Sequence, residues 1–272
     1  MKWPAPCTLT ASGVCLAFLL VFLVLVPKQA SAGTYQSSPE RQTATLRDFG
    51  PWLGPYRTKV TGKMLEDFGE QYLYAPLNAN LSPPKTGEVR VVFLGDSITD
   101  RWDLTQFFPG KPYINRGIGG QVTPQLVVRF HADVVALKPA IVVILAGIND
   151  VQGVMQVESE TEIEANYQAL AEMAVANGIR PVFTQILPIN NYTANAATVL
   201  SDRKPEVLAR LNTWLAGYCL QHGYGLIDYG PSLRDDKGLL AARFTDDGIH
   251  PNAAAYAIMA PIAEQAIESS LR

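Results

Sequence analysis

The hydrophobic positions of residues 88–272 form five short apolar runs, separated by longer stretches with helical periodicity. The runs are 89-VRVVFL-94, 112-PYIN-115, 140-AIVVILA-146, 181-PVFTQIL-187 and 224-YGLIDY-229. Helical patterns cover 123–137, 159–178 and 203–222, and a last one starts at 252 with an expected bend at Pro261. Short apolar runs are typical of strands covered on both faces, and their alternation with helices predicts a parallel α/β sheet.

Polar and glycine-rich residues directly follow the first three runs. Ser97 comes just after the first run, 117-GIGG-120 after the second and 147-GIND-150 after the third. The carboxyl ends of parallel strands share one edge of the sheet, and ligands bind beyond that edge. The pattern therefore predicts a site that gathers these three segments.

A serine nucleophile at this edge needs a base and a group that orients the base. Of the three histidines, His131 fits a helix surface and His222 fits the end of a helix. His250 instead lies in the polar loop 246-DDGIHPNA-253, three residues after Asp247. That spacing lets the Asp247 carboxylate reach the imidazole Nδ1–H. Asp246 is the alternative orienting acid. The alternative interpretation of the loop is a plain turn before a helix.

Hydrolysis of an ester also needs donors for the oxyanion of the tetrahedral intermediate. Gly120 can supply a backbone N–H, Asn149 a side-chain amide and Ser97 its own N–H. Each feature also has a structural interpretation, because glycines follow strands in tight turns and asparagine caps helices. Their convergence with Ser97 and His250 on one sheet edge favours the catalytic interpretation.

Four motif blocks in this order resemble the SGNH hydrolases, the GDSL-like lipase/acylhydrolase family. They are 95-GDSIT-99, 115-NRGIGGQ-121, 147-GIND-150 and 247-DGIH-250, and the resemblance covers about residues 88–271. It implies an α/β fold, a flavodoxin-like three-layer α/β/α sandwich with a five-stranded parallel sheet. The α/β-hydrolase fold is not expected, because the chain has no G-x-S-x-G elbow.

The resemblance also assigns roles to individual residues. Ser97 is expected to be the nucleophile, and Asp247 and His250 complete its triad. The Ser97 N–H, Gly120 and Asn149 are expected to form the oxyanion hole. Gly120 is preferred to Gly119 because 118-IGG-120 aligns with the family's second block.

The expected reaction is hydrolysis of a carboxylic ester through an acyl-enzyme, without a metal or another cofactor. No His or Cys pair has metal-ligand spacing, and 117-GIGG-120 is not a dinucleotide-binding G-x-G-x-x-G motif. The substrate is expected to be a small-molecule or glycan ester with a short acyl group, since no long apolar lid segment is evident. A lysophospholipase, an acyltransferase and a non-catalytic carbohydrate-binding protein are the alternatives.

Three aromatic residues just after the nucleophile bear on the substrate. Trp102, Phe107 and Phe108 could stack on a sugar ring or contact an acyl chain. The alternative, which we favour, is that they pack in the core.

The first 32 residues have the layout of a secretory signal. Lys2 precedes an apolar run from Val14 to Val26, and Ala30-Ser31-Ala32 forms an A-x-A cleavage site. Thirteen residues are few for a membrane span, which needs about 20. We therefore expect cleavage after Ala32 and a secreted or periplasmic protein, with an uncleaved membrane anchor as the alternative.

The predicted organisation is a signal peptide over 1–32, an N-terminal extension with short helices over 33–87 and a hydrolase domain over 88–272. Cleavage would remove Lys2 and Lys28 and change the formal net charge of −3 to −5, which provides no basic face for nucleic acid. It would also leave Cys219 as the single cysteine, so no internal disulfide is expected. No membrane span is expected in the mature chain.

Overall fold

The structure is a computed structural model that describes residues 58–59, 61–62, 64–155 and 158–272. The expected signal peptide and its cleavage site lie outside the described residues. None of the helices in the described part of the chain is long and apolar enough to cross a membrane.

Five parallel strands form one sheet in the order β2-β1-β3-β4-β5. They are β1 (Val91–Gly95), β2 (Tyr113–Gly117), β3 (Ile141–Leu145), β4 (Arg180–Thr184) and β5 (Gly225–Ile227). This is the flavodoxin-like order, in which the chain reverses direction beside β1. The predicted α/β class, the parallel sheet and the number of strands are confirmed.

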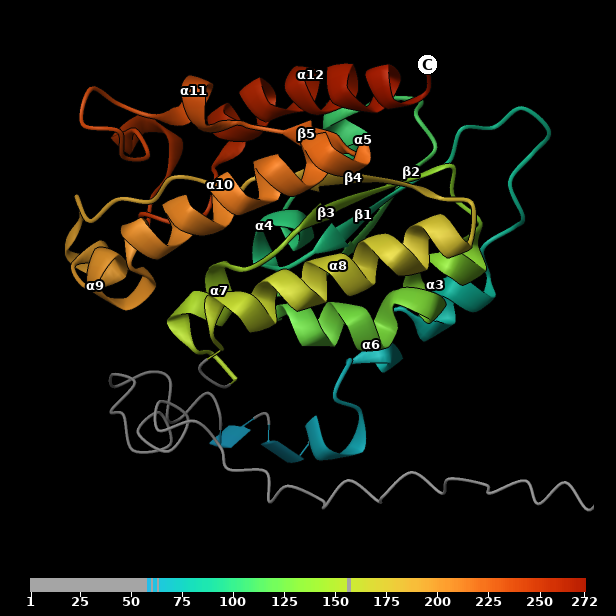
Figure 1. Cartoon of the computed structure of the whole chain (residues 1–272), viewed down its shortest axis with the longest axis horizontal. Coiled ribbons are helices and arrows are strands. Elements are labelled where there is room, and N and C mark those ends of the chain that lie inside the picture. The colour runs from blue at the N-terminus through green and yellow to red at the C-terminus, as the bar shows by residue number, and fades with distance from the viewer. Residues whose placement is uncertain (1–57, 60, 63, 156–157) are drawn as a thin grey trace, which may run out of the picture. The chain divides into compact units, whose positions relative to one another are not determined.

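Helices cover both faces of the sheet (Figure 1). One face packs against α6 (Thr123–Asp133), α8 (Glu160–Ala176) and α10 (Pro205–His222). The other packs against α4 (Ser97–Asp100), α5 (Leu104–Phe107), α11 (Gly230–Leu233) and α12 (Ala253–Ser270). Among the described residues there are also α3 (Ala75–Ala79), α7 (Ile148–Gln152), α9 (Val199–Arg203) and the 3-10 turns η1 (Gln71–Leu73), η2 (Val135–Leu137), η3 (Ala194–Ala196) and η4 (Ala242–Phe244).

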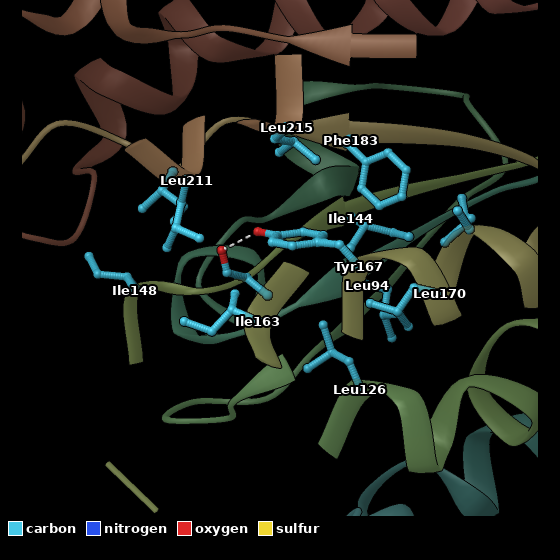
Figure 2. Close-up of a cluster of buried hydrophobic side chains, with 14 of the residues drawn as sticks. Leu94, Leu126, Ile144, Ile148, Ile163, Tyr167, Leu170, Phe183, Leu211 and Leu215 are labelled. Atoms are coloured by element: carbon cyan, nitrogen blue, oxygen red, sulfur yellow. Dashed lines mark hydrogen bonds between the residues drawn. The ribbon is translucent and has the colours of Figure 1, made fainter. Parts of the chain in front are cut away.

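Alternation along the strands builds two hydrophobic cores. Val92 and Leu94 of β1 point into the core beneath α6, α8 and α10, while Val91 and Phe93 point into the core beneath α12. Because every residue of β1 and β3 is buried, both strands read as continuous apolar runs. Figure 2 shows the first core, in which Tyr167 of α8 lies among aliphatic side chains.

Some predicted boundaries were wrong for local reasons. The helix expected over 203–222 begins at Pro205 instead, because Lys204 adopts φ 42° between α9 and α10 and Pro205 disfavours a helical residue before it. The apolar run 181–187 leaves the sheet after Thr184, because β5 pairs only as far as Thr184. The last helix agrees with the pattern that starts at 252, since α12 begins at Ala253 and continues past Pro261 to Ser270.

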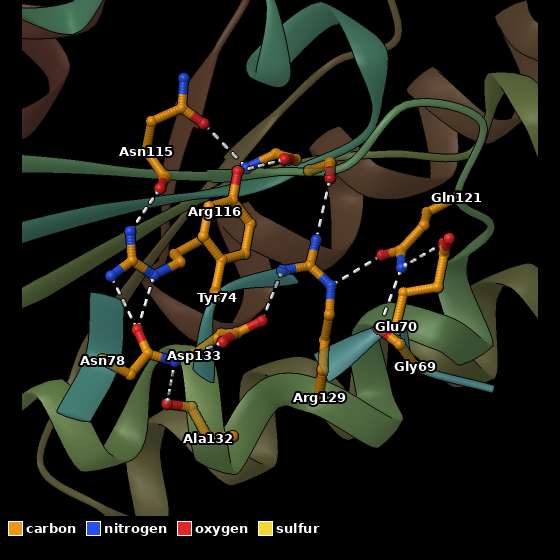
Figure 3. Close-up of polar contacts among 12 residues, drawn as sticks. Gly69, Glu70, Tyr74, Asn78, Asn115, Arg116, Gln121, Arg129, Ala132 and Asp133 are labelled. Carbon is orange, nitrogen blue, oxygen red and sulfur yellow. Dashed lines mark hydrogen bonds and ion pairs between the residues drawn. The ribbon is translucent and has the colours of Figure 1, made fainter. Parts of the chain in front are cut away.

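The segment before the sheet contains η1 and α3 and is tied to the domain by hydrogen bonds (Figure 3). The Tyr74 hydroxyl donates to the Gly117 carbonyl at 2.5 Å, and the Arg116 guanidinium donates to Asn78 Oδ1 at 2.7 and 2.9 Å. Gln121 Nε2 donates to the Gly69 carbonyl at 3.0 Å. These bonds attach the segment to the end of β2 and to the glycine-rich turn that follows it.

A fully buried arginine lies at the centre of this polar cluster. Arg129 of α6 donates to Gln121 Oε1 at 2.6 Å, to Asp133 Oδ2 at 3.0 Å and to the Gly95 carbonyl at 3.0 Å. Neither Arg129 nor Asp133 has an exposed side chain. The guanidinium therefore connects α6 to Gly95, the last residue of β1, two positions before the expected nucleophile Ser97.

We predict that Asp133→Ala lowers the free energy of unfolding by about 3–5 kcal/mol, because it leaves the buried Arg129 charge without its partner. Urea unfolding at neutral pH measures this loss. The matched control is Glu160→Ala, which breaks the exposed ion pair with Arg210 and should cost at most about 1 kcal/mol. Equal losses for the two variants would contradict the role given to the buried pair.

Candidate active site

The nucleophile candidate lies at a sharp turn from β1 into α4. Asp96 caps α4, since its Oδ1 accepts the Ile98 N–H at 2.9 Å, and Ser97 is the first helical residue. The turn needs glycine before it, because a Cβ on Gly95 would lie 2.5 Å from the Leu145 carbonyl oxygen. A Cβ on Gly117 would lie 2.6 Å from the Asp100 Cα, so glycine there lets β2 approach α4.

Ser97, His250 and Asp247 form a hydrogen-bonded chain. Ser97 Oγ lies 2.8 Å from His250 Nε2, and His250 Nδ1 lies 2.6 Å from Asp247 Oδ2. The residues come from opposite ends of the domain, separated by 153 positions between Ser97 and His250. The loop before α12 thus brings His250 and Asp247 to the carboxyl end of β1.

Local bonds within the loop hold the Asp247 carboxylate in place. Its Oδ1 accepts the backbone N–H groups of Ile249 at 3.0 Å and His250 at 2.9 Å. Burial by itself raises the pKa of Asp247, but the bonds from His250 outweigh it and hold the pKa below its usual range. Asp246 is exposed, so Asp247 is the residue that contacts the imidazole.

Two backbone N–H groups in this region are candidates for the oxyanion hole. No described residue accepts the N–H of Ser97 or that of Gly120. Ser97 owes this to its place in the first turn of a helix, where N–H groups lack intrahelical partners. Gly120 has φ 81° and lines the same pocket as Ser97, and a Cβ on Gly119 would lie 3.8 Å from the Ser97 Cβ.

Asn149 in the first turn of α7 faces the same pocket. One of its amide N–H groups donates to the Gln121 carbonyl at 2.9 Å, and no described residue accepts the second N–H of the amide. Its position is supported from β3, because the Tyr167 hydroxyl donates to the Ala146 carbonyl at 2.7 Å (Figure 2). The buried Asp150 carboxylate accepts the Thr123 N–H at 2.8 Å and so links α7 to the start of α6.

These residues line a pocket of about 220 Å³. The sequence predicted Ser97, Gly120, Asn149 and His250 in its wall, and the structure brings them together there. It adds residues to which the sequence analysis gave no role: Arg101, Ile148, Gln152, Val154, Arg203 and Ile249. Arg203 and Gln152 lie outside the four motif blocks, and the packing of α9 on α7 brings them within hydrogen-bond distance of each other.

Other candidates lie away from this pocket. His131 is exposed on α6, and His222 is the last residue of α10, where its ring lies against Tyr218 and Tyr224. Trp102 and Phe108 are buried at 3% and 2% exposure, so neither is available to stack on a substrate ring. Trp102 stacks instead on Tyr256 of α12, with 5.2 Å between ring centroids.

Asn115, in the second motif block, has a structural role beside the serine turn. Its Nδ2 donates to the carbonyls of Thr99 at 2.6 Å and Trp102 at 2.9 Å. Its Oδ1 accepts the Gly117 N–H at 2.8 Å. Asn115 therefore joins the end of α4 to the end of β2 and holds the serine turn against the glycine-rich turn.

Comparisons with known proteins agree with this fold. A profile of the GDSL-like Lipase/Acylhydrolase family matches residues 93–258. A solved structure from Bacteroides fragilis, assigned as an acylhydrolase, is 36% identical with a TM-score of 0.70, over 76% of this chain and 99% of that chain. A GDSL-like lipase from Bacteroides thetaiotaomicron is 34% identical with a TM-score of 0.68, over 75% of this chain and 99% of the other.

A variant of an acetyl xylan esterase from Geobacillus stearothermophilus shares the fold at 22% identity, with a TM-score of 0.53, over 65% of this chain and 94% of its own. No curated protein matches the chain. The family profile spans more than half of the chain and includes both the serine turn and the His250 loop. The chain is an ester-hydrolysing enzyme that belongs to the GDSL-like lipase/acylhydrolase family.

Proposed function

We propose that the enzyme is a serine esterase whose catalytic triad is Ser97, His250 and Asp247. The observation that carries this proposal is the hydrogen-bonded chain from Ser97 Oγ through His250 to Asp247, with Ser97 opening onto the pocket. A serine hydroxyl is a weak nucleophile at its own pKa, so the adjacent imidazole has to accept its proton. Asp247 fixes the imidazole tautomer and stabilises the imidazolium that forms.

In the first half of the reaction, His250 Nε2 takes the Ser97 proton while Oγ bonds to the carbonyl carbon of the ester. The carbonyl π electrons move to oxygen, and the oxyanion is stabilised by the N–H groups of Ser97 and Gly120 and the free amide N–H of Asn149. The intermediate collapses when its bond to the alcohol oxygen breaks, and His250 protonates that oxygen. Water then attacks the acyl-enzyme in the same way and releases the acid and Ser97.

The pocket favours a short acyl group. Its volume of about 220 Å³ lies below that of typical ligand pockets, about 300–1,000 Å³, and its wall includes polar side chains of Asn149, Gln152 and Arg203. The related fold of acetyl xylan esterases makes acetylated carbohydrates a substrate class to test first. The long-chain lysophospholipid is the second candidate, suggested by the GDSL-like lipase from Bacteroides thetaiotaomicron.

We further propose that residues 1–32 direct export and are removed after Ala32. The proposal rests on the apolar run from Val14 to Val26 and the A-x-A site. N-terminal sequencing of the protein recovered outside the cytoplasm should read from Gly33. A first residue of Met1 would indicate a retained anchor.

Hydrolysis of p-nitrophenyl esters from acetyl to palmitoyl tests the proposed function. We predict that activity is confined to short acyl chains and that Ser97→Ala abolishes it, because the nucleophile is lost while the fold is kept. Circular dichroism of the variant provides the control for folding. Equal activity of Ser97→Ala and wild type would reject the triad, and a preference for palmitoyl would favour a lipid substrate.

Replacing Asn149 tests the oxyanion hole. We predict that Asn149→Ala lowers kcat by about 10²–10³ with a small change in KM, because the lost bond acts mainly in the transition state. The exposed Asn177 at the end of α8 provides the control, and Asn177→Ala should leave kcat unchanged. An unaltered kcat in Asn149→Ala would remove this side chain from the mechanism.

A further inference from the structure

One wall of the catalytic pocket contains a buried arginine that the esterase mechanism does not use. Arg203, the last residue of α9, lines the pocket together with Ser97 and His250. Only 8% of the residue is exposed. Its guanidinium donates to Gln152 Oε1 at 2.6 Å, and its buried Nε–H has no hydrogen-bond partner among the described residues.

This guanidinium is under-satisfied for its degree of burial. A guanidinium carries five N–H donors and a permanent charge, so a buried one is normally paired with a carboxylate. Arg203 makes no ion pair with any carboxylate in the described part of the chain. Burial lowers the pKa of Arg203 to about 10, while the charges of Asp202, Asp247 and Asp96 oppose that shift. Within the described part of the chain, the charge and at least one donor of Arg203 therefore have no partner.

A second arginine adds positive charge to the same pocket. Arg101 lines it as well, and its side chain is 54% exposed with Nη1 3.8 Å from Asp247 Oδ2. By contrast, Arg129 is fully buried but binds Asp133, Gln121 and a backbone carbonyl. The comparison shows how this fold satisfies a structural arginine, and Arg203 lacks that set of partners.

We propose that Arg203 is an anion subsite that binds a carboxylate carried by the ester substrate. The inference rests on the proposed esterase function and adds the substrate class: acylated hydroxy acids, or half-esters of dicarboxylic acids. A planar guanidinium matches a carboxylate in geometry and can donate two parallel bonds to it. A monoanion suits the pocket better than a dianionic phosphate, because Asp247 and Asp96 contribute negative charge to the surroundings of Arg203.

Two pairs of near-isosteric esters test the subsite from either side of the scissile bond. On the alcohol side, 4-acetoxybenzoate is compared with neutral 4-acetoxyacetophenone; on the acyl side, ethyl hydrogen succinate is compared with neutral ethyl levulinate. Hydrolysis by the full purified enzyme is followed in a pH-stat at neutral pH. Each kcat/KM is corrected for the ester's rate of alkaline hydrolysis.

We predict that wild type prefers the anionic ester in one of the two pairs, which identifies the side that Arg203 contacts. Arg203→Gln should lower the anionic-to-neutral ratio of kcat/KM in that pair by about tenfold or more, the effect of losing a charged hydrogen bond. Arg203→Lys should keep part of the preference. The control Arg210→Gln, an exposed arginine of α10 paired with Glu160, should leave the ratio as in wild type.

A wild-type enzyme without preference for the anionic ester in either pair would overturn the subsite, whatever the variants do. Ratios that change equally in Arg203→Gln and Arg210→Gln would also overturn it. If Arg203→Gln fails to fold in a thermal unfolding experiment, the wild-type and Arg203→Lys ratios decide. Failure of wild type to hydrolyse any of the four esters or p-nitrophenyl acetate would contradict the proposed function itself, whereas hydrolysis without anion preference would contradict only the subsite.

Discussion

The carbonyl group of Gly95 joins the parts of the molecule on which the active site depends. It accepts the Ile118 N–H at 3.0 Å and the buried Arg129 guanidinium at 3.0 Å. The first bond attaches the glycine-rich turn to the end of β1, and the second attaches α6. Because a buried guanidinium without partners is strongly unfavourable, these bonds are difficult to rearrange one at a time. These bonds therefore hold the backbone in place two residues before Ser97.

The parallel direction of the strands explains how segments that are distant in sequence reach one pocket. All five strands are parallel, so the turns after β1, β2 and β3 lie along one edge, and the His250 loop closes over that edge from the start of α12. Tyr256 of α12 reinforces this closure, because its hydroxyl donates to the Ile98 carbonyl at 2.7 Å, next to Ser97. The distance between Ser97 and His250 thus depends on the packing of α12 against α4.

The sequence predicted the parts of the site that follow from strand ends and short spacing. Ser97, Gly120 and Asn149 each follow an apolar run, and Asp247 lies close enough to His250 in sequence for a local hydrogen bond. Arg203 was not predictable in this way, because its place in the pocket depends on how α9 packs against α7. The buried role of Arg129 likewise depends on contacts with Gly95 and Gln121, which no helical pattern reveals. Trp102 was ambiguous in sequence because stacking on a ligand and packing on Tyr256 require the same side chain.

The central claim is that Ser97 is the activated nucleophile, and covalent labelling tests it most directly. A fluorophosphonate reacts with a serine only when a neighbouring base removes the hydroxyl proton, so the adduct reports activation without assuming a substrate. Intact-mass measurement and peptide mapping should find a single phosphonyl group on Ser97, formed before any other serine reacts. An enzyme that hydrolyses esters while Ser97 stays unlabelled, or that is labelled at another residue, would contradict this account.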